Sequence, residues 1–200
     1  MKQILLASNN KNKLKEFKEL FSEFGYDVIS QAEAGIHMEA EENADSFAGN
    51  AFIKANAACE LSGLPAVADD SGLVVDALNG EPGIYSARYG GKLASTDIER
   101  YQYLLKKLGS EEKRSARFVC SICCVFPNGD VLHAEDSCEG DILFEPHGDN
   151  GFGYDPVFRP AGYDCSMAEL ESAEKNSISH RGKAARKFIT EFSRYINDYE

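Results

Sequence analysis

The chain has 200 residues, 43% of them hydrophobic, and a formal net charge of −12 at pH 7. Because this length and apolar content supply one sizeable core, we expect a single domain over residues 1–200. The negative charge argues against a nucleic-acid partner, since binding to a phosphate backbone depends on clustered Lys and Arg. It leaves open a small polyanion that is held by a few basic groups and a divalent cation.

The sequence shows neither a membrane segment nor an export signal. The longest apolar runs, such as 4–7 and 118–126, are too short and too interrupted by polar residues to span a bilayer. The first residues lack the apolar stretch and cleavage site of a secretory signal, so we expect a cytoplasmic protein. The six cysteines are expected to be reduced and to fill space in the core, because no second ligand pair completes a zinc site.

Three elements are predicted at the start of the chain. A buried strand covers residues 3–8, a helix covers 10–24, and a second helix covers 46–61. Asn50 and Lys54 lie four residues apart and so share one face of the second helix. The apolar positions expected to face the core in these helices are Leu14, Phe17, Leu20, Phe21, Phe24, Phe47, Ala51, Ala55, Ala58 and Leu61.

Strands and helices continue through the rest of the chain, which completes a mixed α/β fold. A strand over 66–68 is predicted to end at Asp69-Asp70-Ser71-Gly72, so that two carboxylates lie at a strand terminus, and an extended run resumes over 73–75. Next come a Gly- and Pro-rich loop over 80–91, a helix from a Ser95 cap to Leu108 with Ile98 inward, and antiparallel strands over 117–126 and 131–137. The last predicted elements are a glycine-rich loop over 148–156, a strand at 157–158, a capping box at Ser166, and a terminal helix. The buried stripe of that helix is predicted to consist of Ala185, Phe188, Ile189, Phe192 and Ile196.

The polar segment Ser8-Asn9-Asn10-Lys11-Asn12-Lys13 lies between a predicted strand and the first turn of a helix. Free backbone N–H groups and the positive end of the helix dipole favour phosphate there, and Lys13 adds a full positive charge. The segment lacks the glycines of a P-loop. A polar capping loop with solvated lysines is therefore the alternative interpretation.

Asp69 and Asp70 are adjacent carboxylates that repel each other, so a cation or a set of hydrogen-bond donors is expected beside them. Magnesium fits this site, because it prefers a few carboxylates together with waters and phosphate oxygens. Glu41 or Glu42 is expected to supply a further oxygen from the preceding loop. The alternative is an ordinary Asp-Ser-Gly turn.

The other candidate residues are weak signals when each is taken alone. Lys54 by itself is typical of an exposed lysine. Phe152 and Tyr154 lie among glycines, which allow a ligand to approach the backbone, and their rings are suited to stacking on a purine; loop packing explains them equally well. Three residues near a helix boundary are also compatible with a simple arrangement of charges at helix ends: Lys175, His180 and Arg181.

Six segments follow one another in a distinctive order. They are Ser8-Asn9-Asn10-x-x-Lys13, Ser46-Phe47-x-x-Asn50-Ala51-x-x-Lys54-Ala55, Ala68-Asp69-Asp70-Ser71-Gly72-Leu73, Pro82-Gly83-Ile84-Tyr85-Ser86-Ala87-Arg88-Tyr89, Gly151-Phe152-Gly153-Tyr154-Asp155-Pro156 and Ser179-His180-Arg181. Together they closely resemble the inosine triphosphate pyrophosphatase family, and the match spans almost the whole chain.

The resemblance implies an α/β fold with an elongated mixed sheet, flanking helices and two lobes around a central cleft, usually in a homodimer. It implies that Ser8 to Lys13 hold the triphosphate, that Glu42 or Glu41 and Asp70 serve Mg²⁺, and that Asp70 or Asp69 activates water. Lys54 and Ser71 are implied to touch the substrate as well. The implied nucleoside pocket consists of Phe152, Gly153, Tyr154, Asp155, Lys175, His180 and Arg181.

We therefore expect an enzyme that hydrolyses non-standard purine nucleoside triphosphates, such as ITP, dITP and XTP, to the monophosphate and pyrophosphate. This activity would keep such nucleotides out of DNA and RNA. Three alternatives stay open: a pyrophosphatase for pyrimidine or methylated nucleotides, a non-catalytic nucleotide sensor, and a metal-dependent phosphatase that releases orthophosphate.

Overall fold

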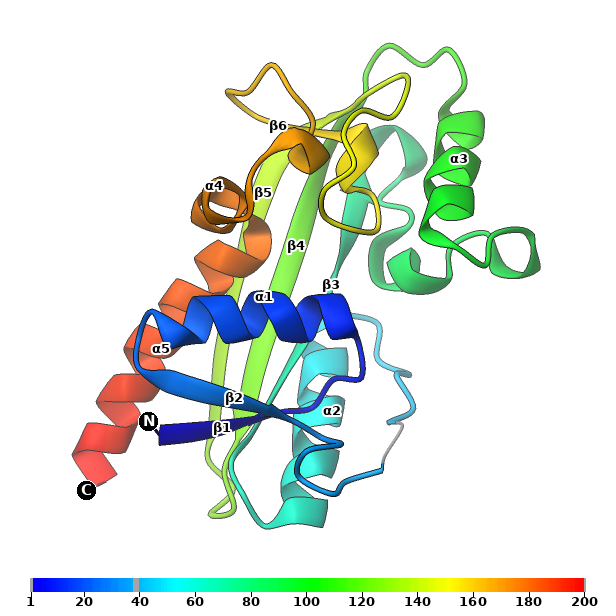
Figure 1. Ribbon diagram of the computed structural model, residues 1–200. Helices are drawn as coiled ribbons and strands as arrows, with labels where there is room; N and C mark the ends of the chain where they lie inside the picture. The colour runs from blue at the N-terminus through cyan, green and yellow to red at the C-terminus, as the bar shows by residue number, and fades with distance from the viewer. Residues whose placement is uncertain (1, 38–39, 200) are drawn as a thin grey trace. The chain divides into compact units, whose positions relative to one another are not determined.

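The computed structural model describes residues 2–37 and 40–199, and their strands form one mixed sheet (Figure 1). The strands are β1 (Lys2–Leu6), β2 (Tyr26–Ser30), β3 (Ala66–Val75), β4 (Ser115–Val125), β5 (Val131–Ile142) and β6 (Phe158–Pro160), and the sheet order is β2-β1-β3-β4-β5-β6. The pairs β1–β2 and β1–β3 are parallel, whereas β5–β6 is antiparallel. The α-helices are α1 (Lys11–Ser22), α2 (Phe47–Ser62), α3 (Asp97–Leu108), α4 (Ser172–Ile178) and α5 (His180–Tyr199). The predicted mixed α/β class is confirmed.

The chain divides into two compact units. Unit 1 consists of Met1–Asp70, Cys120–Asp136 and Arg181–Glu200, and unit 2 consists of Ser71–Val119 and Ser137–His180. Each unit has buried hydrophobic clusters of its own. The expectation of a single domain stays a prediction, and the two units are described separately below.

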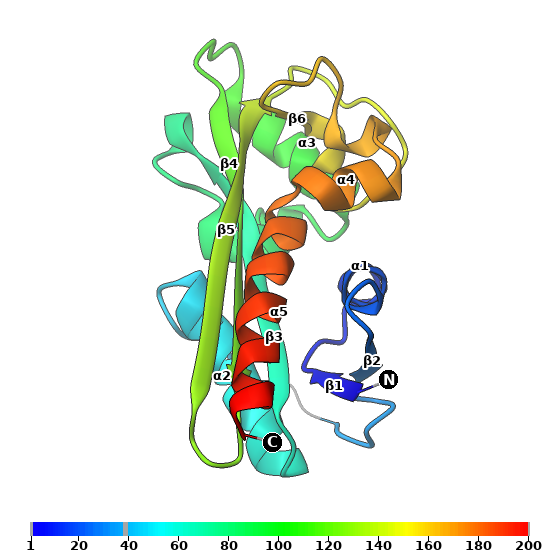
Figure 2. The same cartoon turned by 90° about the vertical axis from the view of Figure 1, so that its left-hand side faces the viewer.

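The core of unit 1 lies on both faces of its strands, because successive side chains of a strand point to opposite faces. Ile4 and Leu6 of β1 pack with α1 and α5, whereas Leu5 packs with α2 on the other face. Figure 2 shows α5 lying along β4 and β5, and the buried cysteines and Ile122 of β4 belong to these same clusters. The side chains that α2 buries against its face are small: Ala51, Ala55, Ala58 and Cys59.

Local signals set the ends of the helices in unit 1. The Asn10 side chain caps α1 by accepting hydrogen bonds from two backbone N–H groups of the first turn. Ser46 caps α2 in the same way, and Gly63 ends that helix in the left-handed region at φ 66°. Both helices therefore lie where the sequence predicts them.

Three residues predicted to face the core are instead exposed: Phe24, Leu61 and Ile98. Phe24 lies beyond the last residue of α1, and the other two lie in the terminal turns of α2 and α3. The helical spacing predicted too much burial at these three positions. The ends of a helix extend beyond the strands or helices against which its middle packs, so apolar residues near the ends are left exposed. Helix α3 also begins one residue later than predicted, with Thr96 rather than Ser95 as its cap.

The predicted end of the strand at Asp69-Asp70-Ser71-Gly72 is wrong, and so is the alternative of a turn there. Strand β3 continues without a break from Ala66 to Val75, so the two carboxylates lie inside a strand. They are 2% and 7% exposed, and the half-buried ammonium groups of Lys13 and Lys54 pair with them where a turn would have exposed them to water. Because neighbouring residues of a strand point to opposite faces, the two carboxylates cannot act as one side-by-side pair.

Two further elements have no counterpart among the predictions, namely β2 and α4. From Tyr26 to Ser30 the side chains of β2 alternate between buried and more exposed positions. A period of two residues is the pattern by which a strand is recognised in a sequence. The capping box at Ser166 is confirmed, but it opens only the 3-10 turn Met167–Glu169. Strand β5 continues to Ile142, five residues past the predicted end at 137.

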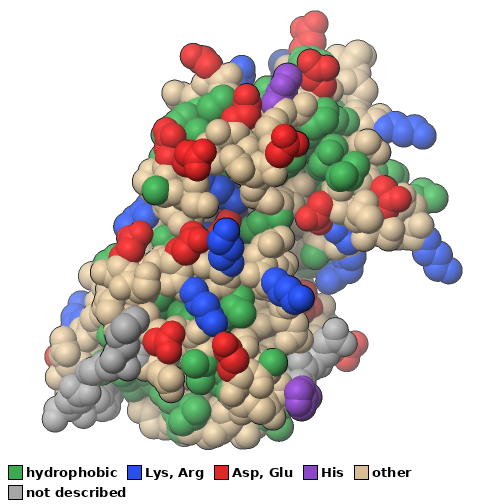
Figure 3. Space-filling model, in the orientation of Figure 1, with side chains coloured by type: hydrophobic (Ala, Val, Ile, Leu, Met, Phe, Trp, Pro, Cys, Tyr) green, Lys and Arg blue, Asp and Glu red, His purple; other side chains and the backbone are tan. Residues whose placement is uncertain are grey.

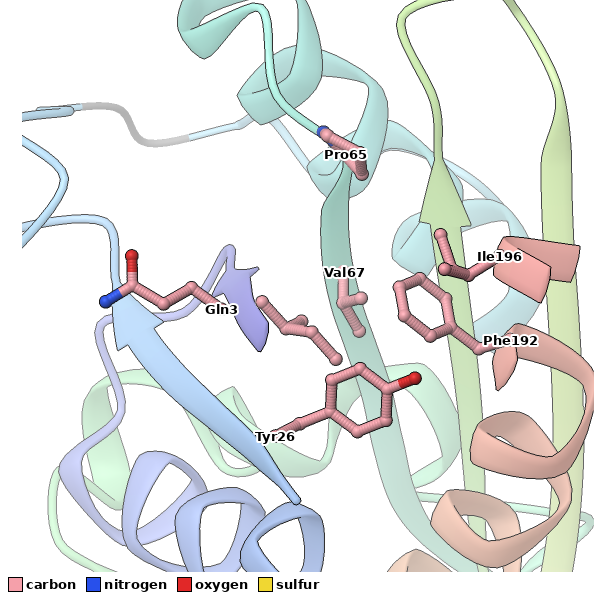
Figure 4. A pocket seen from close by; sticks show the side chains of 7 residues that line it. Gln3, Tyr26, Pro65, Val67, Phe192 and Ile196 are labelled. Atoms are coloured by element: carbon pink, nitrogen blue, oxygen red, sulfur yellow. The ribbon is translucent and has the colours of Figure 1, made fainter. Parts of the chain in front are cut away.

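Unit 1 contains a cavity of about 190 Å³ (Figure 4). The side chains of Tyr26, Val67 and Phe192 point toward one another around it, and it is also lined by Gln3, Ile4, Pro65 and Ile196. It lies beside the amino-terminal ends of β1 and β3. Ligands of such sheets bind beyond the carboxyl ends of the parallel strands, so the cavity lies at the opposite end of these strands from the expected ligand site.

Within the described part of the chain, every helix is too short or too polar to cross a lipid bilayer. All six cysteines are unbridged, and five of them are buried. Both observations agree with the sequence predictions of a chain without membrane spans and of reduced, space-filling cysteines.

Candidate active site

Asp69 projects toward the face of β3 that α1 and α5 cover. Its carboxylate lies 3.0 Å from Lys13 Nζ and 3.5 Å from a guanidinium nitrogen of Arg181, which also pairs with Glu16. Burial by itself would raise the pKa of Asp69, but Lys13 and Arg181 outweigh burial and hold that pKa well below its ordinary value. Asp69 therefore stays ionised, in the centre of a buried ionic network.

Asp70 projects toward the opposite face, which α2 covers. Asn50 donates to one carboxylate oxygen at 3.2 Å, and Lys54 Nζ lies 3.2 Å from the other. Lys54 Nζ is also 2.9 Å from Glu42, so one ammonium group joins two carboxylates. Burial raises the pKa of Asp70, Lys54 opposes this rise, and the nearby Glu42 and Asp69 add to it, which leaves the pKa above its ordinary value.

The charges of this cluster nearly cancel. Three cations, Lys13, Lys54 and Arg181, contact four carboxylates, those of Glu16, Glu42, Asp69 and Asp70. Such a cluster has no positive charge to spare for a polyanion, so a triphosphate requires further cations. The oxygen donors of Glu42 and Asp70, which converge on one ammonium group, are of the type that Mg²⁺ prefers. Among the described residues, no group of three or more His, Cys, Asp or Glu side chains forms a ready metal site.

The segment 8–13 lies at the carboxyl end of β1 and starts α1. Its caps are internal: Asn10 accepts from the N–H groups of Asn12 and Lys13, and Ser8 accepts from the N–H of Asn10. Lys and Arg side chains gather over α1 on the face shown in Figure 3. A phosphate bound here would compete with the Asn10 side chain for the same two N–H groups.

The side chain of Asp155 fixes the glycine-rich loop Gly151–Asp155 of unit 2. It accepts from the backbone N–H of Phe152 at 2.8 Å and from Lys175 Nζ at 2.7 Å, and Asp155 and Lys175 are both buried. A Cβ on Gly151 would lie 2.2 Å from the Asp155 carboxylate, so only glycine fits there. Lys175 Nζ also lies over the Phe152 ring, 5.0 Å from its centroid.

Two further contacts in unit 2 hold aromatic and polar groups of the predicted pocket. The Tyr154 hydroxyl donates to the backbone oxygen of Ser86 at 2.9 Å. Burial raises the pKa of Tyr154, so its hydroxyl stays a neutral donor. The buried His180 ring stacks on Phe118, with centroids 4.7 Å apart.

The structure therefore gathers most predicted site residues into two clusters. In unit 1 they are Lys13, Glu42, Lys54, Asp69, Asp70 and Arg181, and in unit 2 they are Phe152, Gly153, Tyr154, Asp155 and Lys175. Arg181, predicted in the nucleoside pocket, lies in the ionic network of unit 1. Glu41 is exposed, and Ser71 follows Asp70 as a half-buried residue of unit 2.

Comparisons with known proteins agree on one family. The Ham1 family model matches residues 4–191. This chain belongs to the Ham1 family. The dITP/XTP pyrophosphatase of Haemophilus influenzae is 49% identical over 191 residues, which cover 92% of this chain and 96% of the relative. That of Desulfotalea psychrophila is 47% identical over 193 residues, which cover 96% and 86%. A HAM1 protein structure from Coxiella burnetii matches with a TM-score of 0.87 at 43% identity, covering 97% of this chain and all of the other.

Membership of the Ham1 family confirms the resemblance carried by the six motifs. Four residues that contact the two clusters were not predicted as site residues: Asn50 of the Ser46–Ala55 motif, Glu16, Ser86, and Asp97, which accepts from the N–H of Gly153. Glu16 lies three residues after Lys13, which places both on one face of α1. Ser86 lies inside the motif Pro82–Tyr89, to which the sequence assigned no role. No sequence signal singles out Asp97.

Proposed function

We propose that this Ham1-family chain hydrolyses non-standard purine nucleoside triphosphates, such as ITP, dITP and XTP, to the monophosphate and pyrophosphate. In a cell this reaction removes them from the nucleotide pool before they enter DNA or RNA. The two relatives described above are dITP/XTP pyrophosphatases, and each matches this chain over nearly its whole length. The observation that carries the proposal is the ammonium group of Lys54, held between the carboxylates of Glu42 and Asp70.

Asp70 is the better candidate for the general base. Asn50 and Lys54 contact its carboxylate, which leaves it less strongly neutralised than a carboxylate placed between two cations. Asp69, in contrast, is held by Lys13 and Arg181 and has a lowered pKa. In the proposed reaction Asp70 accepts a proton from water as the water oxygen attacks the α-phosphorus. The bond from that phosphorus to the bridging oxygen breaks, and pyrophosphate leaves with the bond's electrons.

The cations of unit 1 would stabilise the charge that moves onto pyrophosphate. Phosphoryl transfer depends mainly on positioning and charge neutralisation, and Lys13 and Lys54 are fixed in place by their carboxylate partners. We propose that Glu42 and Asp70 hold Mg²⁺, which when bound supplies the additional positive charge that a triphosphate needs. The exposed Glu41 is the less suitable ligand, because Glu42 is the residue that contacts Lys54.

The residues of unit 2 are proposed to select the base. Phe152 offers an aromatic face, and the loop around it is fixed by Asp155 and Lys175. A donor such as His180 would face a 6-oxo group, where adenine instead presents a donor. A site built on such a hydrogen bond discriminates by about four to five powers of ten.

One experiment separates the proposal from its alternatives. The purified protein is incubated with Mg²⁺ and, in parallel, inosine, xanthosine, adenosine and pyrimidine triphosphates, and the products are identified by chromatography. Monophosphate and pyrophosphate from inosine and xanthosine triphosphates support the proposal. Orthophosphate would indicate a phosphatase, turnover of pyrimidine substrates a different specificity, and binding without turnover a sensor.

The resemblance also leads us to propose a homodimer, and the nucleotide substrates proposed above lead us to propose a cytoplasmic location. Light scattering coupled to size-exclusion chromatography tests the assembly, since a dimer has twice the 22.0 kDa mass of one chain. A single-chain mass at micromolar concentration would contradict it.

A further inference from the structure

The peptide plane between Phe152 and Gly153 is held at both of its ends. Its N–H, on Gly153, donates to Asp97 Oδ2 at 2.9 Å. Its C=O, on Phe152, accepts from the backbone N–H of Asp155 at 3.3 Å. The second contact comes from within the glycine-rich loop, whereas the first comes from the start of α3, 56 residues away in the sequence.

Without the contact to Asp97, this plane would have an easy alternative orientation. Gly153 has φ of +65°, and glycine adopts positive and negative φ almost equally readily. A peptide plane that precedes glycine therefore turns over at little steric cost. A Cβ at Gly153 would meet no atom within 4 Å, so packing around its Cα does not prevent the turn. The observed orientation is favoured by the Asp97 acceptor for the N–H at 2.9 Å and, at the longer distance of 3.3 Å, by the Asp155 donor to the C=O.

The carboxylate of Asp97 is available to accept from Gly153, because other side chains cap α3. Thr96 accepts from the backbone N–H of Glu99, and Glu99 in turn accepts from the N–H groups of Ser95 and Thr96. The second carboxylate oxygen of Asp97 accepts from Arg100 at 2.7 Å, which fixes the side chain in place. The carboxylate is thus oriented by its own helix and directed at the loop.

The orientation of this plane sets the position of the Phe152 ring. The plane is attached to the Phe152 Cα, and on the other side of that Cα the N–H is bound to Asp155. With both adjoining peptide groups fixed, the direction of the Phe152 Cα–Cβ bond is set, and the ring lies with its centroid 5.0 Å from Lys175 Nζ. An aromatic platform is useful for base selection only when its place is fixed before the ligand arrives.

We propose that Asp97 is a positioning residue that holds the Phe152–Gly153 peptide and thereby sets selectivity for the base. The expected change in base selectivity rests on the proposed function. The role of Asp97 in holding the Phe152–Gly153 peptide does not. Asp97 acts through the loop and has no role in the chemistry at the α-phosphorus.

The test compares Asp97→Ala with Glu99→Ala. Both substitutions remove an acidic side chain from the first turn of α3, but only the first removes the acceptor for Gly153. We expect Asp97→Ala to raise KM for inosine triphosphate about tenfold, the effect of one hydrogen bond to a charged group, and to change kcat less than threefold. The ratio of kcat/KM for inosine over adenosine triphosphate should fall by roughly the same factor. Asp97→Asn, which keeps an acceptor oxygen, should recover most of the loss.

A second measurement does not depend on catalysis. Amide hydrogen exchange at Gly153, followed by NMR, should be faster in Asp97→Ala than in the wild-type protein and in Glu99→Ala. Unchanged exchange at Gly153, or equal kinetic losses in the Ala variants at 97 and 99, would overturn the inference. If the wild-type protein released no pyrophosphate, the proposed function would fail, and the exchange result would still decide whether Asp97 holds the loop.

Discussion

The ionic cluster of unit 1 and the glycine-rich loop of unit 2 hold their polar groups in different ways. In unit 1, charged side chains from α1, α2 and α5 contact one another around Asp69 and Asp70. In unit 2, most of the contacts that fix the loop involve backbone groups, with Lys175–Asp155 as the buried ion pair. Charge clusters suit phosphates, which every nucleotide carries, whereas fixed backbone geometry suits the shape of one base.

This difference has a kinetic consequence. Changes in the unit 1 cluster should lower the rate for every triphosphate by a similar factor, because all of them share the same phosphate chain. Changes in the unit 2 loop should alter the preference between bases. The predictions below test this contrast.

Asp70→Asn should have the largest effect. It removes the proposed base but keeps the side-chain shape, and losing such a group typically lowers kcat by about a hundredfold or more. The loss should be equal for inosine and adenosine triphosphates, measured as pyrophosphate release. Asp27→Asn, on the exposed side of β2, is the matched control and should retain full activity. A changed ratio between the two substrates would break the contrast.

Asp69→Asn should mainly affect stability and its pH dependence. It leaves Arg181 and Lys13 without their buried partner, which should lower the free energy of unfolding by about 3 kcal/mol at pH 7. Because the pKa of Asp69 is lowered on folding from its ordinary 3.8, its stabilisation is complete above that value and is lost as pH falls further. The difference between variant and wild type should therefore shrink below about pH 3.8, by roughly 1.4 kcal/mol per pH unit.

Urea unfolding at several pH values measures this difference. Asp76→Asn, which removes an exposed partner of Arg117, should cost less than about 1 kcal/mol at every pH. A constant difference for Asp69→Asn between pH 7 and pH 3 would show that its carboxylate is not held by the two cations.

Lys175→Met should change the choice of substrate. It removes the buried partner of Asp155 and the cation over Phe152, which corresponds to about 2 kcal/mol and so to roughly a thirtyfold fall in kcat/KM for inosine triphosphate. The fall for adenosine triphosphate should be several times smaller. Lys107→Met, at an ion pair of unit 2 that is far more exposed, is the control. Equal losses for the two substrates would remove the distinction between the units.

Tyr154→Phe should have the smallest effect. It deletes the hydroxyl that donates to Ser86 and keeps the ring, so the free energy of unfolding should fall by about 1 kcal/mol. Thermal unfolding measures this change. A loss above about 3 kcal/mol would mean that the Ser86 contact supports more of unit 2 than its one hydrogen bond suggests.

Much of the fold could be predicted from the sequence where local signals are strong. The helix starts expected at Asn10 and Ser46 and the apolar spacing of α1, α2 and α5 gave helices that the structure confirms. Strand β3 was predicted less well, because Asp69 and Asp70 look like turn residues when their partners are unknown. Those partners come from α1, α2 and α5, and no local pattern shows which distant cation neutralises a buried carboxylate.

The candidate site shows the same limit. The family motifs placed Lys13, Lys54 and Asp70 among the site residues, and the structure brings them into one cluster. The motifs did not show that Asp69 and Asp70 point to opposite faces, which follows only once β3 is known to be continuous. They also gave no role to Asp97, because its contact with the glycine-rich loop is made across 56 residues.

The burial of the cysteines has a practical consequence for labelling this protein. Thiolates are the form that alkylating reagents attack, and burial raises the pKa of Cys123 to about 11 and those of Cys120 and Cys124 further. Cys165 is the half-buried exception among the six. A maleimide dye at neutral pH should therefore attach at this one natural position in unit 2 without any engineered residue.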